Sequence, residues 1–106
     1  LEFLTIVVDV DIDITAADIQ TILAATPVST LVFVDEAYRE YHEAFDTFAL
    51  LDAWGGPWVS GRTFSKAYGL AGLRVGFAIT SAPVADLMNR VRQPFNVNSL
   101  AQAAAV

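Results

Sequence analysis

Short apolar runs alternate with segments of helical periodicity along the 106 residues of this chain. Short runs of β-branched and aromatic residues are typical of strands, and apolar residues three or four positions apart are typical of helices. An alternation of the two is typical of the α/β class. The sequence predicts strands over residues 2–10, 30–35, 58–62 and 74–80, and helices from Thr15, over 45–54, over 82–92 and from near Asn98.

Capping residues indicate where two of the helices begin. Thr15 can cap the first helix, and Asp18 lies in its first turn, where a carboxylate interacts favourably with the helix dipole. Ser99 and Gln102 have the spacing of a capping box at the start of the last helix. That helix reaches Val106 without a stop signal, which we interpret as a sign that the chain is a fragment of something longer.

The composition excludes several classes of function. A net charge of -6 without a cluster of Lys or Arg argues against a nucleic-acid partner, because phosphate binding needs several cations on one face. There is no cysteine, so disulfides and thiolate metal sites are excluded. No segment has the pattern of a signal peptide or a membrane helix, and we expect a cytoplasmic protein with no membrane partner.

The apolar content is high for a small domain. Hydrophobic residues make up 55% of the chain. A small domain has a large surface-to-volume ratio, which calls for polar residues. We therefore expect part of the apolar surface to contact another chain or a missing domain.

A carboxylate closes the apolar run TLVFVD. Such a run predicts a buried parallel strand, so its last residue, Asp35, is expected at the carboxyl edge of the sheet. Tyr38 follows three residues later. A structural interpretation stays open, in which Asp35 caps a turn and Tyr38 fills the edge of the core.

The stretch TFSKAYGLAGLRVG contains Lys66, the only lysine in the chain. A lone lysine is usually a solvated surface residue, but the neighbours Phe64, Ala67 and Tyr68 are largely apolar, and desolvation lowers the pKa of an amine as a Schiff-base lysine requires. Around it lie hydroxyls, glycines and a guanidinium that suit a phosphate, namely Thr63, Ser65, Gly69, Gly72, Gly76 and Arg74.

This combination of groups favours one cofactor. The spacing matches neither a P-loop nor a dinucleotide-binding fingerprint. Pyridoxal phosphate needs a lysine for its Schiff base and an anion that keeps its ring nitrogen protonated. Lys66 and Asp35 are the candidates for these two roles.

Other polar and aromatic residues have structural interpretations. For three alternating aspartates we expect a solvated face and no metal site, for the single histidine no ligand or base role, and for two tryptophans packing beside a turn. These residues are Asp9, Asp11, Asp13, His42, Trp54 and Trp58. We expect Glu36, Arg39 and Glu40 to form an exposed polar segment.

In order, spacing and residue type, VDEAY, TFSKAYGLAGLRVG and RQPFNVNSLAQAAA resemble the fold-type I pyridoxal-phosphate aminotransferases, most closely their histidinol-phosphate aminotransferase branch. The resemblance runs from about Thr15 to Val106. It implies a partial three-layer α/β/α large domain with a mostly parallel sheet, so that residues 1–106 are a single incomplete cofactor-binding domain.

The chain also departs from the family pattern. The family's N-P-x-N-P-T-G segment should precede the helix at Thr15, but residues 1–14 do not match it, and they are divergent, mis-framed or foreign to the fold. The upstream glycine-rich phosphate loop and the C-terminal small domain have no counterpart in the sequence either.

The resemblance implies a role for each matching residue. Lys66 matches the lysine that forms the Schiff base with pyridoxal 5'-phosphate and then moves a proton on the substrate. Asp35 matches the partner of the ring nitrogen, and Tyr38 matches the hydroxyl that hydrogen-bonds the ring oxygen O3'. The phosphate-holding positions match Thr63, Ser65 and Arg74, with the glycines shaping the loop.

The activity implied is amino transfer between histidinol phosphate and 2-oxoglutarate in histidine biosynthesis, by a homodimer acting on a small amino-acid-like substrate. Two alternatives stay open. One is a non-catalytic fragment or remnant that self-associates through its apolar surface. The other is a related pyridoxal-phosphate-dependent decarboxylase of amino-acid phosphates, because the residues that read the substrate lie mostly outside this chain.

Overall fold

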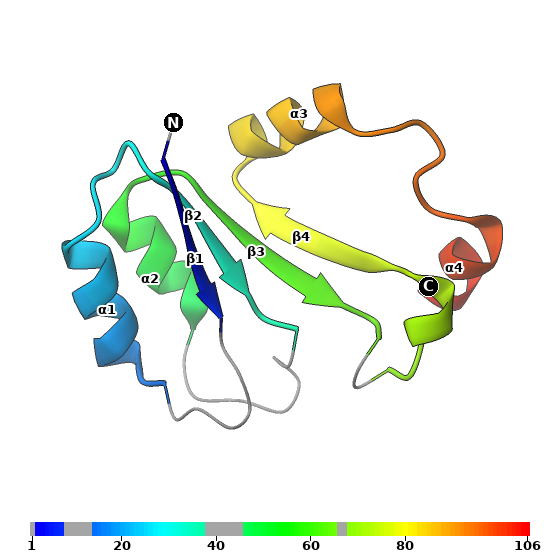
Figure 1. Ribbon diagram of the computed structural model, residues 1–106, viewed down its shortest axis with the longest axis horizontal. Helices are drawn as coiled ribbons and strands as arrows, with labels where there is room; N and C mark the ends of the chain where they lie inside the picture. The colour runs from blue at the N-terminus through cyan, green and yellow to red at the C-terminus, as the bar shows by residue number, and fades with distance from the viewer. Residues whose placement is uncertain (1, 8–13, 38–45, 66–67) are drawn as a thin grey trace.

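A computed structural model of the protein describes residues 2–7, 14–37, 46–65 and 68–106 (Figure 1). Within these ranges the strands form one four-stranded sheet in the order β1-β2-β3-β4. The first three strands are parallel, and the last is antiparallel to its neighbour. Their bounds are β1 Phe3–Val7, β2 Leu31–Asp35, β3 Trp58–Thr63 and β4 Gly76–Thr80. The predicted α/β class with a mostly parallel sheet is confirmed.

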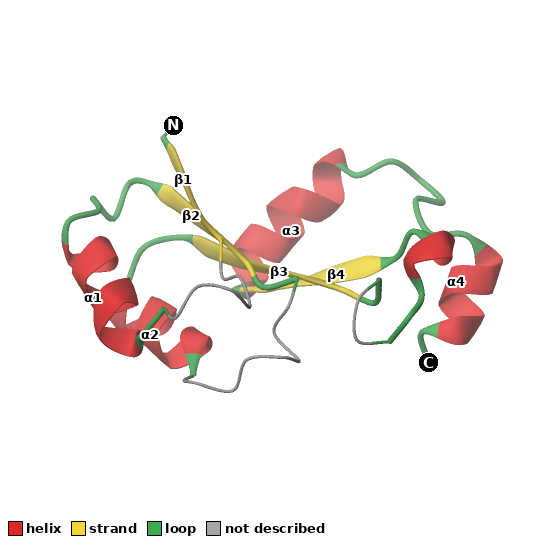
Figure 2. Ribbon diagram, turned by 60° about the horizontal axis from the view of Figure 1, so that its bottom comes forward, coloured by secondary structure: helices red, strands yellow, loops and turns green. Residues whose placement is uncertain are grey.

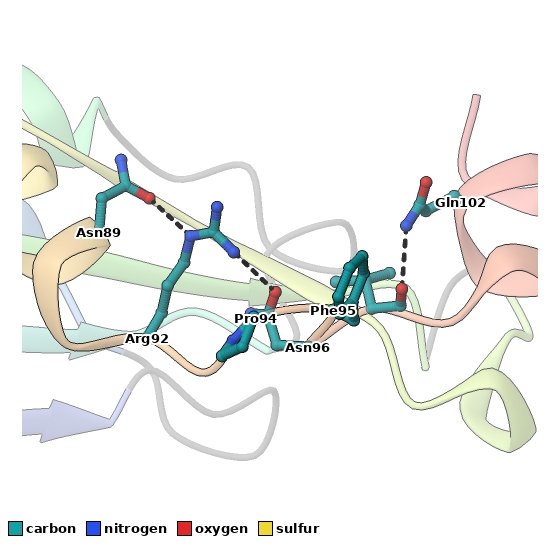
Figure 3. A pocket seen from close by; sticks show the side chains of 7 residues that line it. Asn89, Arg92, Pro94, Phe95, Asn96 and Gln102 are labelled. Atoms are coloured by element: carbon teal, nitrogen blue, oxygen red, sulfur yellow. Dashed lines mark hydrogen bonds between the residues drawn. The ribbon is translucent and has the colours of Figure 1, made fainter.

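Helices cover both faces of the sheet, which gives three layers. Two of them, α1 (Ala16–Ala24) and α2 (Thr47–Trp54), lie side by side on one face, and α3 (Ala82–Val91) lies on the other (Figure 2). The short helix α4 (Ser99–Ala104) and the 3-10 helix η2 (Ala71–Leu73) lie near the start of β4 (Figure 1).

The core lies between the sheet and the pair α1 and α2. In β2 the side chains alternate, so that Val32 and Val34 point to this face and are 0% exposed. They join an apolar cluster with Ile19 of α1 and Leu51 of α2, both also fully buried. Each such side chain contributes about 1.5–3 kcal/mol by leaving water. Leu31, Phe33 and Asp35 alternate to the opposite face, the side on which α3 lies.

The predicted cap of the first helix is confirmed. The Thr15 hydroxyl accepts a hydrogen bond from the Asp18 backbone N–H at 3.2 Å, and the Asp18 carboxylate accepts one from the Thr15 N–H at 2.8 Å. Two orphan donors of the helix start are therefore satisfied reciprocally.

The second helix starts later than predicted, and the last helix starts as predicted but is capped differently. The second helix begins at Thr47, not at residue 45, because the Asp46 carboxylate caps it by accepting from two backbone N–H groups at 3.1 and 3.2 Å. In the last helix Asn98 is the cap, with its Oδ1 accepting from Ala101 N–H at 2.8 Å. The predicted box is wrong, since Gln102 instead donates to the Val97 carbonyl at 2.9 Å.

The tryptophans pack, as predicted. Trp54 donates its indole N–H to the Thr26 carbonyl at 3.1 Å, which ties the end of α2 to the end of α1. Trp58 donates to Asp52 at 3.2 Å and stacks on Phe48 with ring centroids 5.6 Å apart. Both rings therefore join α2 to its surroundings.

Several expectations fall on residues that the structure does not describe, and they stay predictions. They concern Asp9, Asp11, Asp13, Arg39, Glu40 and His42. Within the described ranges, no cluster of three or more acidic, His or Cys side chains could hold a metal ion. None of the helices in these ranges is both long and apolar enough to cross a membrane.

The capping box should make α1 sensitive to acid. Hydrogen bonds from the Thr15 backbone N–H and then from its hydroxyl hold the pKa of Asp18 below the ordinary value of 3.8. Because the folded-state pKa is depressed, the stabilisation is complete above 3.8 and is lost as the pH falls through the lower folded value. We expect Asp18→Asn to remove this part of the acid dependence, measured as free energy of unfolding at neutral and acidic pH.

The matched control is Asp86→Asn, which changes an exposed aspartate on α3. It should keep the acid dependence of the parent chain. An Asp18→Asn protein with an unchanged acid dependence would contradict the role given to the capping box.

Candidate functional site

Asp35 is the last residue of β2 and lies half-buried at the carboxyl edge of the parallel strands. Its Oδ1 accepts a hydrogen bond from Ala37 N–H at 3.1 Å, which closes a tight turn directly after the strand. Beside it in the sheet is Gly61 of β3. The Phe33 ring lies over this glycine, because a Cβ there would be 2.5 Å from the ring. Asp35 therefore points to a face on which the Phe33 ring of β2 covers the backbone of β3 at Gly61.

Thr63 and Ser65 are brought together at the end of β3. Thr63 closes the strand on the same face as Gly61, and its hydroxyl oxygen accepts from the Ser65 backbone N–H at 3.0 Å. Both side chains are half-buried. The two predicted hydroxyls therefore lie at the same sheet edge as Asp35.

Antiparallel pairing returns Arg74 to this edge. Phe64 N–H donates to the Val75 carbonyl at 3.2 Å, and Leu70 N–H donates to the Phe64 carbonyl at 2.9 Å, so the loop after β3 is closed next to Ser65. Arg74 precedes Val75 and is exposed at the end of η2. Its Nη1 donates to the Ala71 carbonyl at 3.0 Å.

Arg74 has left-handed backbone angles, φ 53° and ψ 53°. A residue other than glycine in this region costs roughly 1–3 kcal/mol, and such strain clusters at functional sites. The same turn explains why β4 begins at Gly76 and not at residue 74 as predicted. Among the described residues of the loop, Gly69 is also left-handed, with φ 67°.

Two predicted site residues, Tyr38 and Lys66, lie outside the described residues. Their cofactor roles stay predictions from the sequence. The described residues on either side of positions 66 and 67 are Ser65 and Tyr68, and Tyr68 packs against Phe64 with ring centroids 5.6 Å apart.

The described groups fit the chemistry of pyridoxal phosphate. A planar guanidinium and hydroxyls suit a phosphate, and the backbone hydrogen bond from Phe64 N–H to the Val75 carbonyl brings the segment that carries Arg74 next to Thr63 and Ser65. A half-buried carboxylate suits a protonated ring nitrogen, and Asp35 lies on the same face of the sheet as Thr63. The described groups therefore include a cation and two hydroxyls suited to the phosphate and an anion suited to the protonated ring nitrogen.

One important residue was missed from the sequence. Glu36 was expected to be exposed, but it is 1% exposed and lies on the core face, so that expectation is wrong. Its carboxylate accepts hydrogen bonds from the hydroxyls of Ser60 and Thr47. The alternation of Val32 and Val34 could have revealed it, since Glu36 is the next residue of that buried series.

The architecture is that of a three-layer α/β domain, and the described groups at its carboxyl edge suit a phosphate-bearing cofactor. Residues 12–106 match the family described as aminotransferase class I and II, and the chain belongs to that family. Enzymes of the family depend on pyridoxal phosphate and act on amino-acid-like substrates.

The chain is similar in sequence to bacterial histidinol-phosphate aminotransferases. It is 73% identical over 92 residues to histidinol-phosphate aminotransferase 2 of Caulobacter vibrioides, a match that covers 86% of this chain and 24% of the relative. It is 53% identical over 94 residues to histidinol-phosphate aminotransferase 1 of Cupriavidus pinatubonensis, covering 86% and 25%. The chain thus spans about a quarter of the length of these curated relatives.

Solved structures share the fold. Histidinol-phosphate aminotransferase from Sinorhizobium meliloti, in complex with pyridoxal-5'-phosphate, superposes with a TM-score of 0.76 at 29% identity, covering 97% of this chain and 29% of that one. L-threonine-O-3-phosphate decarboxylase from Porphyromonas gingivalis superposes with a TM-score of 0.75 at 24% identity, covering 99% and 33%. At that identity the second likeness concerns the fold alone.

The close approach of β3 and β4 that places Arg74 should depend on Gly76. A Cβ there would lie 2.6 Å from the Arg62 carbonyl oxygen, so one strand must shift. We expect Gly76→Ala to destabilise the chain by about 1–3 kcal/mol, measured by denaturant unfolding. Gly72→Ala is the control, because its Cβ meets nothing within 4 Å, and it should change stability by less than about 0.5 kcal/mol. Equal effects of the two substitutions would contradict the steric argument.

Proposed function

We propose that this chain is the cofactor-binding part of a pyridoxal-phosphate-dependent aminotransferase that transfers the amino group between histidinol phosphate and 2-oxoglutarate. The observation that carries the proposal is the 73% identity to an enzyme of that name over 86% of the chain. The resemblance in sequence also implies that the protein is cytoplasmic, that it acts in histidine biosynthesis and that it forms a homodimer.

Each proposed site residue has a role that its chemistry supports. Asp35 holds the ring nitrogen in its protonated form, since a carboxylate stabilises a nearby cation. Arg74 holds the phosphate through its planar guanidinium, and the hydroxyls of Thr63 and Ser65 donate to the same oxygens. When bound, pyridoxal phosphate supplies a carbonyl that accepts the amino group and a ring that withdraws electrons from the substrate.

The remaining roles belong to the two residues assigned from the sequence alone. Lys66 anchors the cofactor covalently through its amine and, once displaced by the substrate, moves a proton on the substrate carbon. Tyr38 donates its hydroxyl to the ring oxygen O3'. Asp35 and Tyr38 would then hold the ring nitrogen and the ring oxygen O3', respectively.

An apolar surface beside α3 supports the alternative of self-association. An apolar groove of about 500 Å³ lies between α3 and the starts of β2 and β3. Such a surface supports the alternative of a non-catalytic piece that self-associates. It is lined by Leu31, Pro57, Val84, Leu87, Met88 and Val91. The decarboxylase alternative has support from the shared fold alone.

Covalent labelling tests the cofactor. Lys66 is the only lysine, so pyridoxal phosphate followed by borohydride should attach one pyridoxyl group to the peptide that contains it, detected by mass spectrometry. Lys66→Arg keeps the charge and the N-terminal amine, and it should lose the label. Label of equal extent on both proteins would overturn covalent binding at this residue. Label without amino transfer from histidinol phosphate would support the non-catalytic alternative.

Asp35→Asn tests the role of the carboxylate. The substitution keeps the size of the side chain and its acceptor for Ala37 N–H, but removes the charge that faces the ring nitrogen. We expect pyridoxal phosphate to bind roughly 10- to 100-fold more weakly, the loss of one charge-assisted hydrogen bond, in an absorbance titration. Asp86→Asn removes an exposed charge on α3 and should leave the affinity unchanged. Equal affinities of the two variants would argue against the role of Asp35.

A further inference from the structure

We infer that Glu36 is a positioning residue, which fixes the orientation of the Asp35 carboxylate from beneath the sheet. The significance of that orientation rests on the proposed function. Asp35 and Glu36 are adjacent in the chain, but they lie on opposite faces, one toward the candidate site and one in the core. Contacts that hold the Glu36 side chain therefore also limit the rotation of the backbone at Asp35.

The Glu36 carboxylate is held by two other elements. Its Oε1 accepts from the Ser60 hydroxyl of β3 at 2.6 Å, and its Oε2 accepts from the Thr47 hydroxyl of α2 at 3.1 Å. All three residues are buried, with exposed fractions of 1%, 0% and 2% for Glu36, Ser60 and Thr47. Hydrogen bonds of this kind are stronger away from water, so the carboxylate has little freedom.

A cation compensates part of the buried charge. The Arg62 Nη2 lies 3.6 Å from Glu36 Oε1, and the Arg62 side chain is 19% exposed. Its guanidinium carbon lies 4.9 Å from the centroid of the Phe48 ring, which holds it over α2. Removing the acid would leave this cation half-buried without the partner that the structure gives it.

The backbone transmits this anchor to Asp35. Glu36 N–H donates to the Gly61 carbonyl at 2.9 Å, which extends the β2–β3 ladder beyond the strand end. The next N–H, that of Ala37, donates to Asp35 Oδ1 at 3.1 Å. The peptide groups on both sides of Glu36 are thus held by hydrogen bonds. The turn that orients Asp35 therefore depends on the contacts that hold the Glu36 side chain.

The test compares two amides of the same strand. We expect Glu36→Ala to lower the hydrogen-exchange protection factor of Ala37 N–H at least about tenfold relative to that of Val32, measured by NMR. Val32 N–H is the reference, because it bonds the Pro57 carbonyl at 3.0 Å at the far end of β2. Glu36→Gln keeps an acceptor for both hydroxyls and should restore most of the protection.

A purely structural role would give a different result. Thr15→Ala destabilises the chain through the α1 cap, away from Glu36, and should lower both protection factors by the same factor. If Glu36→Ala also lowers them equally, the positioning role is overturned. Should Glu36→Ala fail to fold, Ser60→Ala decides by the same ratio, because it removes the 2.6 Å hydrogen bond and leaves the acid in place.

The cofactor provides a separate readout. Titration with pyridoxal phosphate should show at least about tenfold weaker binding by Glu36→Ala and unchanged binding by Thr15→Ala. If the unsubstituted chain binds no pyridoxal phosphate, the proposed function of this chain fails, while the exchange ratio still decides the role of Glu36. If it binds and Glu36→Ala binds equally well, the positioning role is overturned and the proposed function stands.

Discussion

Backbone hydrogen bonds join β2 to β3 from Val32 to Asp35 and continue one residue further, through Glu36 N–H to the Gly61 carbonyl. This pairing sets the heights of Asp35 and Thr63 at the carboxyl edge and buries Val34 against the helices. A displacement of β3 along β2 would separate the carboxylate from the hydroxyls and also break the Glu36 anchor. The candidate site and the core therefore depend on the same parallel ladder.

Much of the fold could be predicted from the sequence, because burial imposes periods of two on strands and near four on helices. Periodicity could not predict the direction of a strand in the sheet or the exact ends of strands and helices. Nothing in the apolar pattern of GFAIT distinguishes an antiparallel strand from a parallel one. Strand β4 begins late because Arg74 adopts left-handed angles, and α2 begins late because Asp46 caps it. These ends are decided by hydrogen bonds of single residues.

The positions of some candidate site residues could be predicted from the sequence, while their cofactor roles stay predictions. Asp35 was identified by its place after a buried strand, and the structure has it at the carboxyl edge. Thr63, Ser65 and Arg74 are indicated by their chemistry near Lys66 and by the resemblance, and backbone hydrogen bonds after β3 bring their chain segments together. The exposure predicted for Glu36 is wrong because it rests on the charged residues Arg39 and Glu40 that follow, whereas the partners Ser60 and Thr47 come from other elements of the chain.

The alternation at the end of β2 has a consequence for how such a chain can change. Asp35 and Glu36 differ by one methylene, so a swap of their identities leaves the composition unchanged and a carboxylate on each face. A deletion of one residue within β2, by contrast, would turn the site carboxylate into the core and the core carboxylate out to the site, because side chains alternate with a period of two. Insertions and deletions in this strand are thus far more damaging than its substitutions, and its length is the conserved quantity to expect among working members of the family.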